Sequence, residues 1–98
     1  MVGVTVTFNY DGDFDRARVI RVAGNARAMF EGMSGLHWKF FTYDEKEQVA
    51  RNFYVWETRQ DAERFFTAEL RERVTGLYGV TPAIEYVEIA QIVDNTRG

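Results

Sequence analysis

The sequence predicts a single α+β domain whose elements follow the order β-α-β-β-α-β. Three observations predict it. Apolar residues alternate with a period of two near both ends, two stretches repeat at helical spacing, and a pair of aromatic strand-like segments flanks a charged turn. With 98 residues the chain has the size of one domain, so we assign residues 1–98 to one folding unit.

The first strand and the first helix are read from residues 2 to 32. Val2 to Phe8 alternate apolar and small residues, as in a half-buried strand. Asp13 is the predicted N-cap of a helix that begins at Phe14 and ends near Gly32. Its predicted buried side consists of Ala17, Ile20, Ala23, Met29, Phe30 and Met33.

The central segment predicts a β-hairpin. Residues 36–43 and 48–57 are rich in aromatic and β-branched residues, and the charged turn 44–47 separates them. In both strands the two alternating faces carry large apolar side chains. Trp38 and Phe40 oppose Phe41 and Tyr43 in the first strand. In the second strand Asn52, Tyr54 and Trp56 oppose Phe53 and Val55.

The second helix is predicted to open at Thr58 and to end near Gly76, with Asp61 completing a capping box. A last strand is predicted over 83–93, and the polar tail 94–98 is expected to fray. The apolar stripe of the second helix is Ala62, Phe65, Phe66, Leu70 and Val74.

This order predicts a ferredoxin-like fold, a four-stranded antiparallel sheet with two helices on one face. The uncovered face should be polar in a monomer, but here it would be aromatic, so we predict a homodimer. We expect one face to meet the helices and hold any pocket, namely Val4, Val6, Phe8 and Trp38. We expect the other face to meet the partner, namely Phe41, Tyr43, Tyr54 and Trp56.

Composition excludes several functions. There is no cysteine and one histidine, so a disulfide scaffold and a cysteine nucleophile are excluded, and no metal site is expected. No glycine-rich phosphate loop or dinucleotide fingerprint is found, so no nucleotide cofactor is expected. No signal peptide or membrane-spanning run is found, which predicts a cytoplasmic protein with no membrane partner.

The net charge of −3 argues against nucleic acid as partner. Residues 51–56 resemble an RNA-binding aromatic strand, but Thr5 and Thr7 stand where stacking aromatics are needed.

Residues 35–46 and 53–56 resemble the mono-oxygenases of YdhR type, of the dimeric α/β-barrel superfamily, similar to antibiotic-biosynthesis mono-oxygenases. The likeness rests on the Gly-apolar-x-Trp-Lys start, the Glu-Lys turn and the Tyr-x-aromatic strand. The opening segment Phe8-Asn9-Tyr10-Asp11-Gly12 with Phe14, and the helix start Asp61 to Phe66, are also similar. Such proteins commonly carry two glycines where this chain has Arg51-Asn52, which adds bulk and a charge near the expected pocket.

The resemblance implies two such domains whose sheets form a barrel, and a mono-oxygenase that oxidises a small aromatic or polyketide-like substrate with O₂ and without metal or flavin. The alternative is a non-catalytic small-molecule-binding or cyclase-like dimer of the same fold. Many members of the family have no demonstrated activity, so whether the chain is an enzyme stays open at this point.

An oxygenase of this type needs an apolar pocket and a base for the substrate's proton. On this hypothesis His37 and Tyr54 transfer protons, and Asn52 or Arg51 orients the anion. Neighbouring residues of a strand face opposite sides, so His37 and Trp38 share a pocket only if it wraps the sheet edge. Each of these residues also has a purely structural interpretation in the core or at the dimer contact. The predicted walls are Phe8, Trp38, Phe40 and Phe66.

Overall fold

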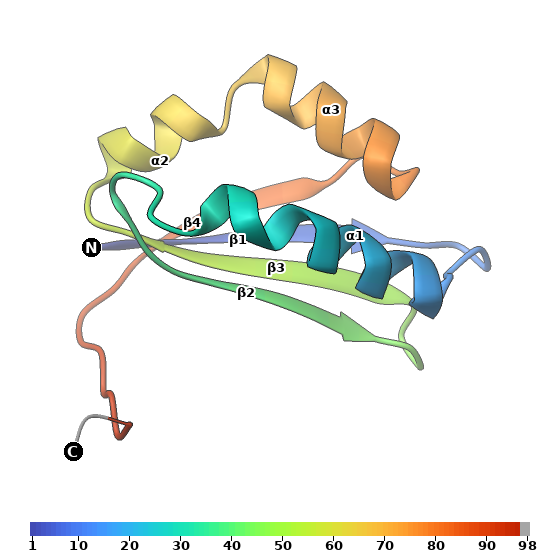
Figure 1. The fold of residues 1–98 in the computed structure, drawn as a ribbon, viewed down its shortest axis with the longest axis horizontal. Helices are drawn as coiled ribbons and strands as arrows, with labels where there is room; N and C mark the ends of the chain where they lie inside the picture. The colour runs from blue at the N-terminus through green and yellow to red at the C-terminus, as the bar shows by residue number, and fades with distance from the viewer. Residues whose placement is uncertain (97–98) are drawn as a thin grey trace.

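The computed structural model describes residues 1–96 and shows a four-stranded antiparallel sheet in the order β2-β3-β1-β4. The three helices lie on one side of it (Figure 1), which confirms the predicted ferredoxin-like fold. The elements are β1 (Val2–Asn9), α1 (Arg16–Phe30), β2 (Leu36–Asp44), β3 (Val49–Trp56), α2 (Arg59–Phe65), α3 (Ala68–Tyr78) and β4 (Ala83–Glu88).

Helix α1 begins two residues later than predicted. Asp15 and not Asp13 is the N-cap, and its carboxylate accepts a hydrogen bond from the Arg18 amide at 3.1 Å. The predicted buried side is wrong in part, because Phe30 and Met33 pack against the core as expected but Met29 is 52% exposed. Val19 is buried, whereas Ile20 keeps 45% of its surface exposed. Both positions are apolar, so helical spacing alone did not decide which of them faces the sheet.

The second predicted helix is two helices, broken between Phe65 and Ala68. Thr67 caps α3, because its hydroxyl accepts a hydrogen bond from the Leu70 amide at 3.2 Å. The break lets the neighbouring rings of Phe65 and Phe66 pack edge-to-face, 5.0 Å apart, against the same core.

The last strand is shorter than predicted. β4 ends at Glu88, which pairs with Val2, and the Ile89 amide still reaches the Met1 carbonyl at 3.1 Å. The residues after Ile89 extend beyond the N-terminal end of β1, where no strand is left to pair with, and they leave the sheet (Figure 1). The fraying predicted for 94–98 concerns in part residues 97 and 98, which lie outside the described residues.

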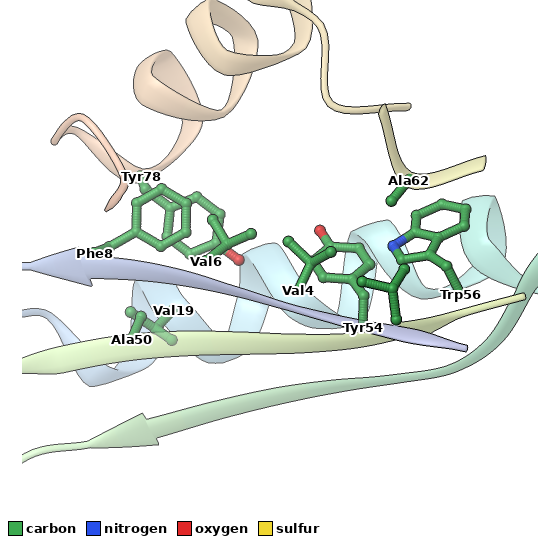
Figure 2. Packing of buried hydrophobic residues seen from close by; sticks show 10 residues of the cluster. Val4, Val6, Phe8, Val19, Ala50, Tyr54, Trp56, Ala62 and Tyr78 are labelled. Atoms are coloured by element: carbon green, nitrogen blue, oxygen red, sulfur yellow. The ribbon is translucent and has the colours of Figure 1, made fainter. Parts of the chain in front are cut away.

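The face assignment of the central hairpin was wrong. Residues that pair directly across an antiparallel ladder share a face. Tyr54 pairs with Val4 and Trp56 pairs with Val2, so both aromatic side chains point to the helices and not to a partner. Figure 2 shows Tyr54 and Trp56 beside Val4 in the core. Phe41 and Tyr43 pair with Asn52 and Ala50 and lie on this helix-covered face too.

The opposite face of the sheet, here called the open face, has no helix over it (Figure 1). Trp38 and Phe40 belong to it, because they pair with Val55 and Phe53 of β3. The Phe53 ring passes so close to Gly3 that an added Cβ would lie 2.9 Å from it, so this position needs a glycine. The apolar side chains of the open face are Trp38, Phe40, Phe53, Val55 and Val87.

Candidate functional site

A cavity of about 280 Å³ lies between the sheet and the helices α1 and α3. Its existence follows from the fold, because both crossovers pack on one face and leave room between them above β1 and β3. Apolar and aromatic walls of this kind are typical of small-molecule sites. The apolar walls include Val6, Phe8, Phe30, Phe41, Phe65, Phe66, Leu70, Val74 and Ile84.

Polar side chains from three elements meet in this cavity. Lys39 comes from β2, Asn52 and Tyr54 come from β3, and Tyr78 comes from the end of α3. All three of the strand residues lie on the helix-covered face, since Lys39 pairs with Tyr54 and the alternate residue Asn52 follows on the same side. The cavity therefore combines apolar walls with a small group of hydrogen-bonding side chains.

Lys39 occupies a cage of aromatic rings. Its Nζ lies 3.4 Å from the centroid of the Phe30 ring, 4.1 Å from that of Phe41 and 4.3 Å from that of Tyr54. It donates a hydrogen bond to the Tyr54 hydroxyl at 2.8 Å. Within residues 1–96, no carboxylate oxygen lies within 4.0 Å of it. Burial among these rings lowers the pKa of Lys39 from 10.5 to about 6, because the charged form loses its hydration.

Tyr54 is buried, with 4% of its surface exposed. Burial raises the pKa of its hydroxyl, and the neighbouring Tyr78 raises it further. Tyr54 therefore keeps its proton at neutral pH and acts as a hydrogen-bonding group. The Phe66 ring packs edge-on against it at 4.9 Å, which fixes the direction of the hydroxyl.

Asn52 and Tyr78 form a second polar pair. The buried Asn52 amide donates to the Tyr78 hydroxyl at 3.2 Å, and the Tyr78 ring stacks on Phe8 with centroids 3.8 Å apart (Figure 2). The Tyr10 hydroxyl donates to the backbone carbonyl of Tyr78 at 2.8 Å. These contacts hold the C-terminal end of α3 against the sheet. Burial raises the pKa of the Tyr78 hydroxyl, an effect that the Asn52 hydrogen bond opposes.

The structure brings four of the predicted site residues to this cavity, namely Phe8, Asn52, Tyr54 and Phe66. Trp38, Phe40 and Arg51 lie elsewhere, on the open face. The expectation that Trp38 shares the pocket face with Phe8 was wrong, because Phe8 pairs with Ala50 on the other side of the sheet.

The remaining predicted residue, His37, lies at the irregular start of β2, outside the cavity. Its ring is exposed and contacts the Glu57 carboxylate. Together with Trp38 and Glu31 it lines a second, more open pocket at the edge of the sheet. This pocket adjoins the cavity, because Phe30, Lys39 and Phe41 line both. His37 and Trp38 both line this pocket, although neighbouring residues of a strand face opposite sides, because the pocket lies at the edge of the sheet.

Lys39 and Tyr78 were missed as site residues in the sequence. A signal for Lys39 was present, since it alternates with Phe41 and Tyr43 on a face that is otherwise aromatic. A lysine at such a position must either pair with an acid or lose its charge. No comparable signal marks Tyr78, because its place depends on the packing of α3 on Phe8.

Two further features of residues 1–96 bear on function. In this part of the chain no three acidic, histidine or cysteine side chains gather closely enough to hold a metal ion. None of the helices described is long and apolar enough to cross a bilayer.

Solved structures share this fold at low sequence identity. The mono-oxygenase from the gene ActVA-Orf6 of Streptomyces coelicolor, in complex with nanaomycin D, superimposes with a TM-score of 0.72 and 20% identity, covering 94% of this chain and 89% of that chain. SnoaB of Streptomyces nogalater, a cofactor-independent oxygenase, superimposes with a TM-score of 0.68 and 18% identity, covering 94% of this chain and 95% of that chain. The NE2512 protein of Nitrosomonas europaea, of unknown function, superimposes with a TM-score of 0.72 and 16% identity, covering 94% of this chain and 91% of that chain.

Sequence comparison identifies the family. A search of curated protein sequences gave no significant match. The family model described as "Putative mono-oxygenase ydhR" matches residues 4–90. This range contains all residues that line the cavity and all four strands, except for the first two residues of β1. The chain therefore belongs to the ydhR mono-oxygenase family.

Proposed function

We propose that this protein is a cofactor-independent mono-oxygenase that oxidises a small aromatic or polyketide-like substrate in the cavity between sheet and helices. The observation that carries the proposal is the aromatic-walled cavity, whose polar lining residues include Lys39, Asn52, Tyr54 and Tyr78. The family and the structural likeness to a cofactor-independent oxygenase and to a mono-oxygenase that holds nanaomycin D support it.

The proposed reaction needs no electrons from outside the substrate. A bound phenol with a free para carbon loses its hydroxyl proton, and its anion passes one electron to O₂. Recombination of the two radicals forms a C–O bond and a peroxide at that carbon. The proton taken from the hydroxyl returns to the peroxide. The O–O bond and the C–H bond at that carbon then break, water leaves, and a para-quinone remains. One atom of O₂ enters the quinone and the other leaves in the water.

The cavity residues have distinct parts in this proposal. Phe8 and Phe66 are walls that hold the substrate ring and exclude water. The Asn52 amide and the Tyr54 hydroxyl hydrogen-bond the substrate oxygens and stabilise the anion. His37 has no part in the proposed reaction, because it lines the neighbouring pocket at the sheet edge and not the cavity itself. The open-face residues likewise have no part in it.

Oxygen uptake tests the proposal. We expect the protein to consume O₂ with at least one member of a panel of phenols, 1-naphthols and anthrones that have a free para carbon, and to form the matching quinone. Val74 lines the cavity, so Val74→Phe should fill it and abolish uptake. Val93, 82% exposed on the tail, provides the matched control Val93→Phe, which should keep full activity. Binding of the panel without any uptake would support the binding or cyclase-like alternative instead.

We also propose that the protein is a homodimer that joins two open faces about a two-fold axis. The large side chains Trp38 and Phe40 are 39% and 52% exposed there, beside Val87 at 49%. An apolar patch of this kind is uncommon on a monomer, and an identical copy covers it symmetrically. The absence of cysteine agrees with the reducing cytoplasm, which is the compartment we propose.

A further inference from the structure

We propose that the amine of Lys39 is the base that takes the hydroxyl proton from a phenol or enol bound in the cavity. This inference rests on the proposed function and adds a catalytic residue and a substrate requirement to it. The substrate must carry a hydroxyl on an aromatic or enolic carbon, and it binds as the neutral molecule.

The position of the amine supports this role. Lys39 lines the cavity, and its hydrogen bond to the Tyr54 hydroxyl orients the nitrogen toward the polar end of the site. A substrate hydroxyl that hydrogen-bonds Tyr54 would also come within reach of Nζ. Because burial favours the neutral amine, the lone pair of Lys39 is free to accept a proton near pH 7.

The charged groups around Lys39 leave the amine without a resident counter-ion. On the α1 side the Glu31 carboxylate is paired with Arg27 at 3.3 Å, and at the start of β2 His37 contacts Glu57. On the cavity side Tyr54 and Tyr78 are held neutral by burial. Arg71 and Arg73 also line the cavity, and their positive charges favour an anion bound there.

The cage stabilises the product of the proton transfer. In this step the substrate O–H bond breaks, an N–H bond forms on Nζ, and no electron changes place. The resulting ammonium faces the rings of Phe30, Phe41 and Tyr54, which attract a cation. The phenolate formed beside it becomes the counter-ion that the protein itself does not supply. The two charges, the Lys39 ammonium and the substrate phenolate, are thus neighbours inside an apolar site, where the electrostatic attraction between them is strong.

The test follows ionisation of a bound phenol without oxygen. A nitrophenol is titrated anaerobically with the protein at a pH above about 6, where the amine of Lys39 is mostly neutral, and below the pKa of the free phenol. We expect the phenolate absorption band to grow on binding with no net proton release to the buffer, because the proton stays on Lys39. Lys39→Met should reduce the bound phenolate fraction about tenfold or more, equivalent to one pKa unit. The exposed lysine of the β2–β3 turn gives the matched control Lys46→Met, which should behave as wild type.

A second variant protects the test if Lys39→Met folds poorly. Arginine remains charged, so Lys39→Arg should also stabilise phenolate, but with one proton released to the buffer for each phenol bound. Release of that proton by the wild-type protein would overturn the inference, since the amine would then already be charged. Absence of a phenolate band in the wild-type complex would overturn it as well.

The two proposals fail separately. Proton transfer to Lys39 without oxygen uptake from any panel member would sustain the base and overturn the oxygenase. Oxygen uptake that Lys39→Met leaves within twofold of wild type would sustain the oxygenase and overturn the base. Failure of every phenol in the panel to bind would overturn both.

Discussion

Lys39 is the residue with the largest expected effect on stability. In the unfolded chain it is charged up to pH about 10.5, whereas in the fold its pKa is about 6, so folding near pH 7 must remove a proton. This penalty is absent above pH 10.5, grows as the pH falls and is complete below about 6. We therefore expect Lys39→Met to raise the free energy of unfolding at pH 7 by roughly 2 to 4 kcal/mol.

Urea titrations between pH 6 and 10 measure this effect. The advantage of Lys39→Met over wild type should shrink steadily as the pH rises, because the proton that folding removes from the lysine is released at lower cost into a more basic solution. Lys46→Met, at an exposed position, should differ from wild type by no more than about 0.5 kcal/mol at any of these pH values. A difference between Lys39→Met and wild type that does not change with pH would show that Lys39 is charged in the fold.

Tyr78 makes a contribution of a different kind. Tyr78→Phe keeps the stack on Phe8 but removes the acceptor of the buried Asn52 amide. A buried donor left without an acceptor costs about 1 to 3 kcal/mol of stability. Tyr43→Phe is the matched control, because the Tyr43 hydroxyl bonds to Arg16 at an exposed site. Thermal unfolding should show a lower midpoint for Tyr78→Phe alone, and equal midpoints would mean that another acceptor replaces the hydroxyl.

At the scale of elements, the break between α2 and α3 depends on one cap. Thr67→Ala removes the oxygen that accepts from the Leu70 amide and should destabilise the fold by about 0.5 to 2 kcal/mol. Thr81→Ala, at an exposed position, should be close to neutral. Hydrogen exchange would locate the effect, since the first-turn amides of α3 should lose protection first. Uniform loss across all helices would contradict a local cap.

The order of the elements was predictable from the sequence, whereas the faces of the hairpin were not. Alternation correctly grouped Asn52, Tyr54 and Trp56 on one face of their strand. It could not say whether that face meets the helices, because Phe53 and Val55 make the other face apolar too. A shift of one residue in the pairing would exchange the two faces. The register is set by contacts far apart in the sequence, such as Tyr54 opposite Val4.

The site was predictable to the extent that it belongs to the core. Phe8 and Phe66 were expected as pocket walls and line the cavity. Asn52 and Tyr54 were expected as site residues and also line it, although Tyr54 was placed on the face that meets the partner. Trp38 was assigned with the wrong face of the hairpin, so it was expected in the pocket and is not there. Lys39 was overlooked because a strand lysine is usually solvated, and only the packing of Phe30 from α1 over its amine shows otherwise.

At the scale of the whole molecule, the two faces of the sheet have separate functions in our proposals. The helix-covered face holds the core and the cavity, with Phe8 and Val4 almost wholly inaccessible to solvent (Figure 2). The open face carries exposed aromatic residues and borders no part of the cavity. Substitutions on the open face should therefore change association and leave the cavity intact, which separates the two proposals experimentally.

The dimer proposal predicts the effect of a charge on the open face. Phe40 is 52% exposed in the single chain, so Phe40→Lys should cost the monomer little but place two like charges in the paired interface. Sedimentation equilibrium should show a wild-type dimer and a Phe40→Lys monomer, with the same far-ultraviolet circular dichroism. Ile20, 45% exposed on the helix side, gives the control Ile20→Lys, which should remain dimeric. A monomeric wild type, or dissociation by Ile20→Lys in place of Phe40→Lys, would refute the open face as the contact.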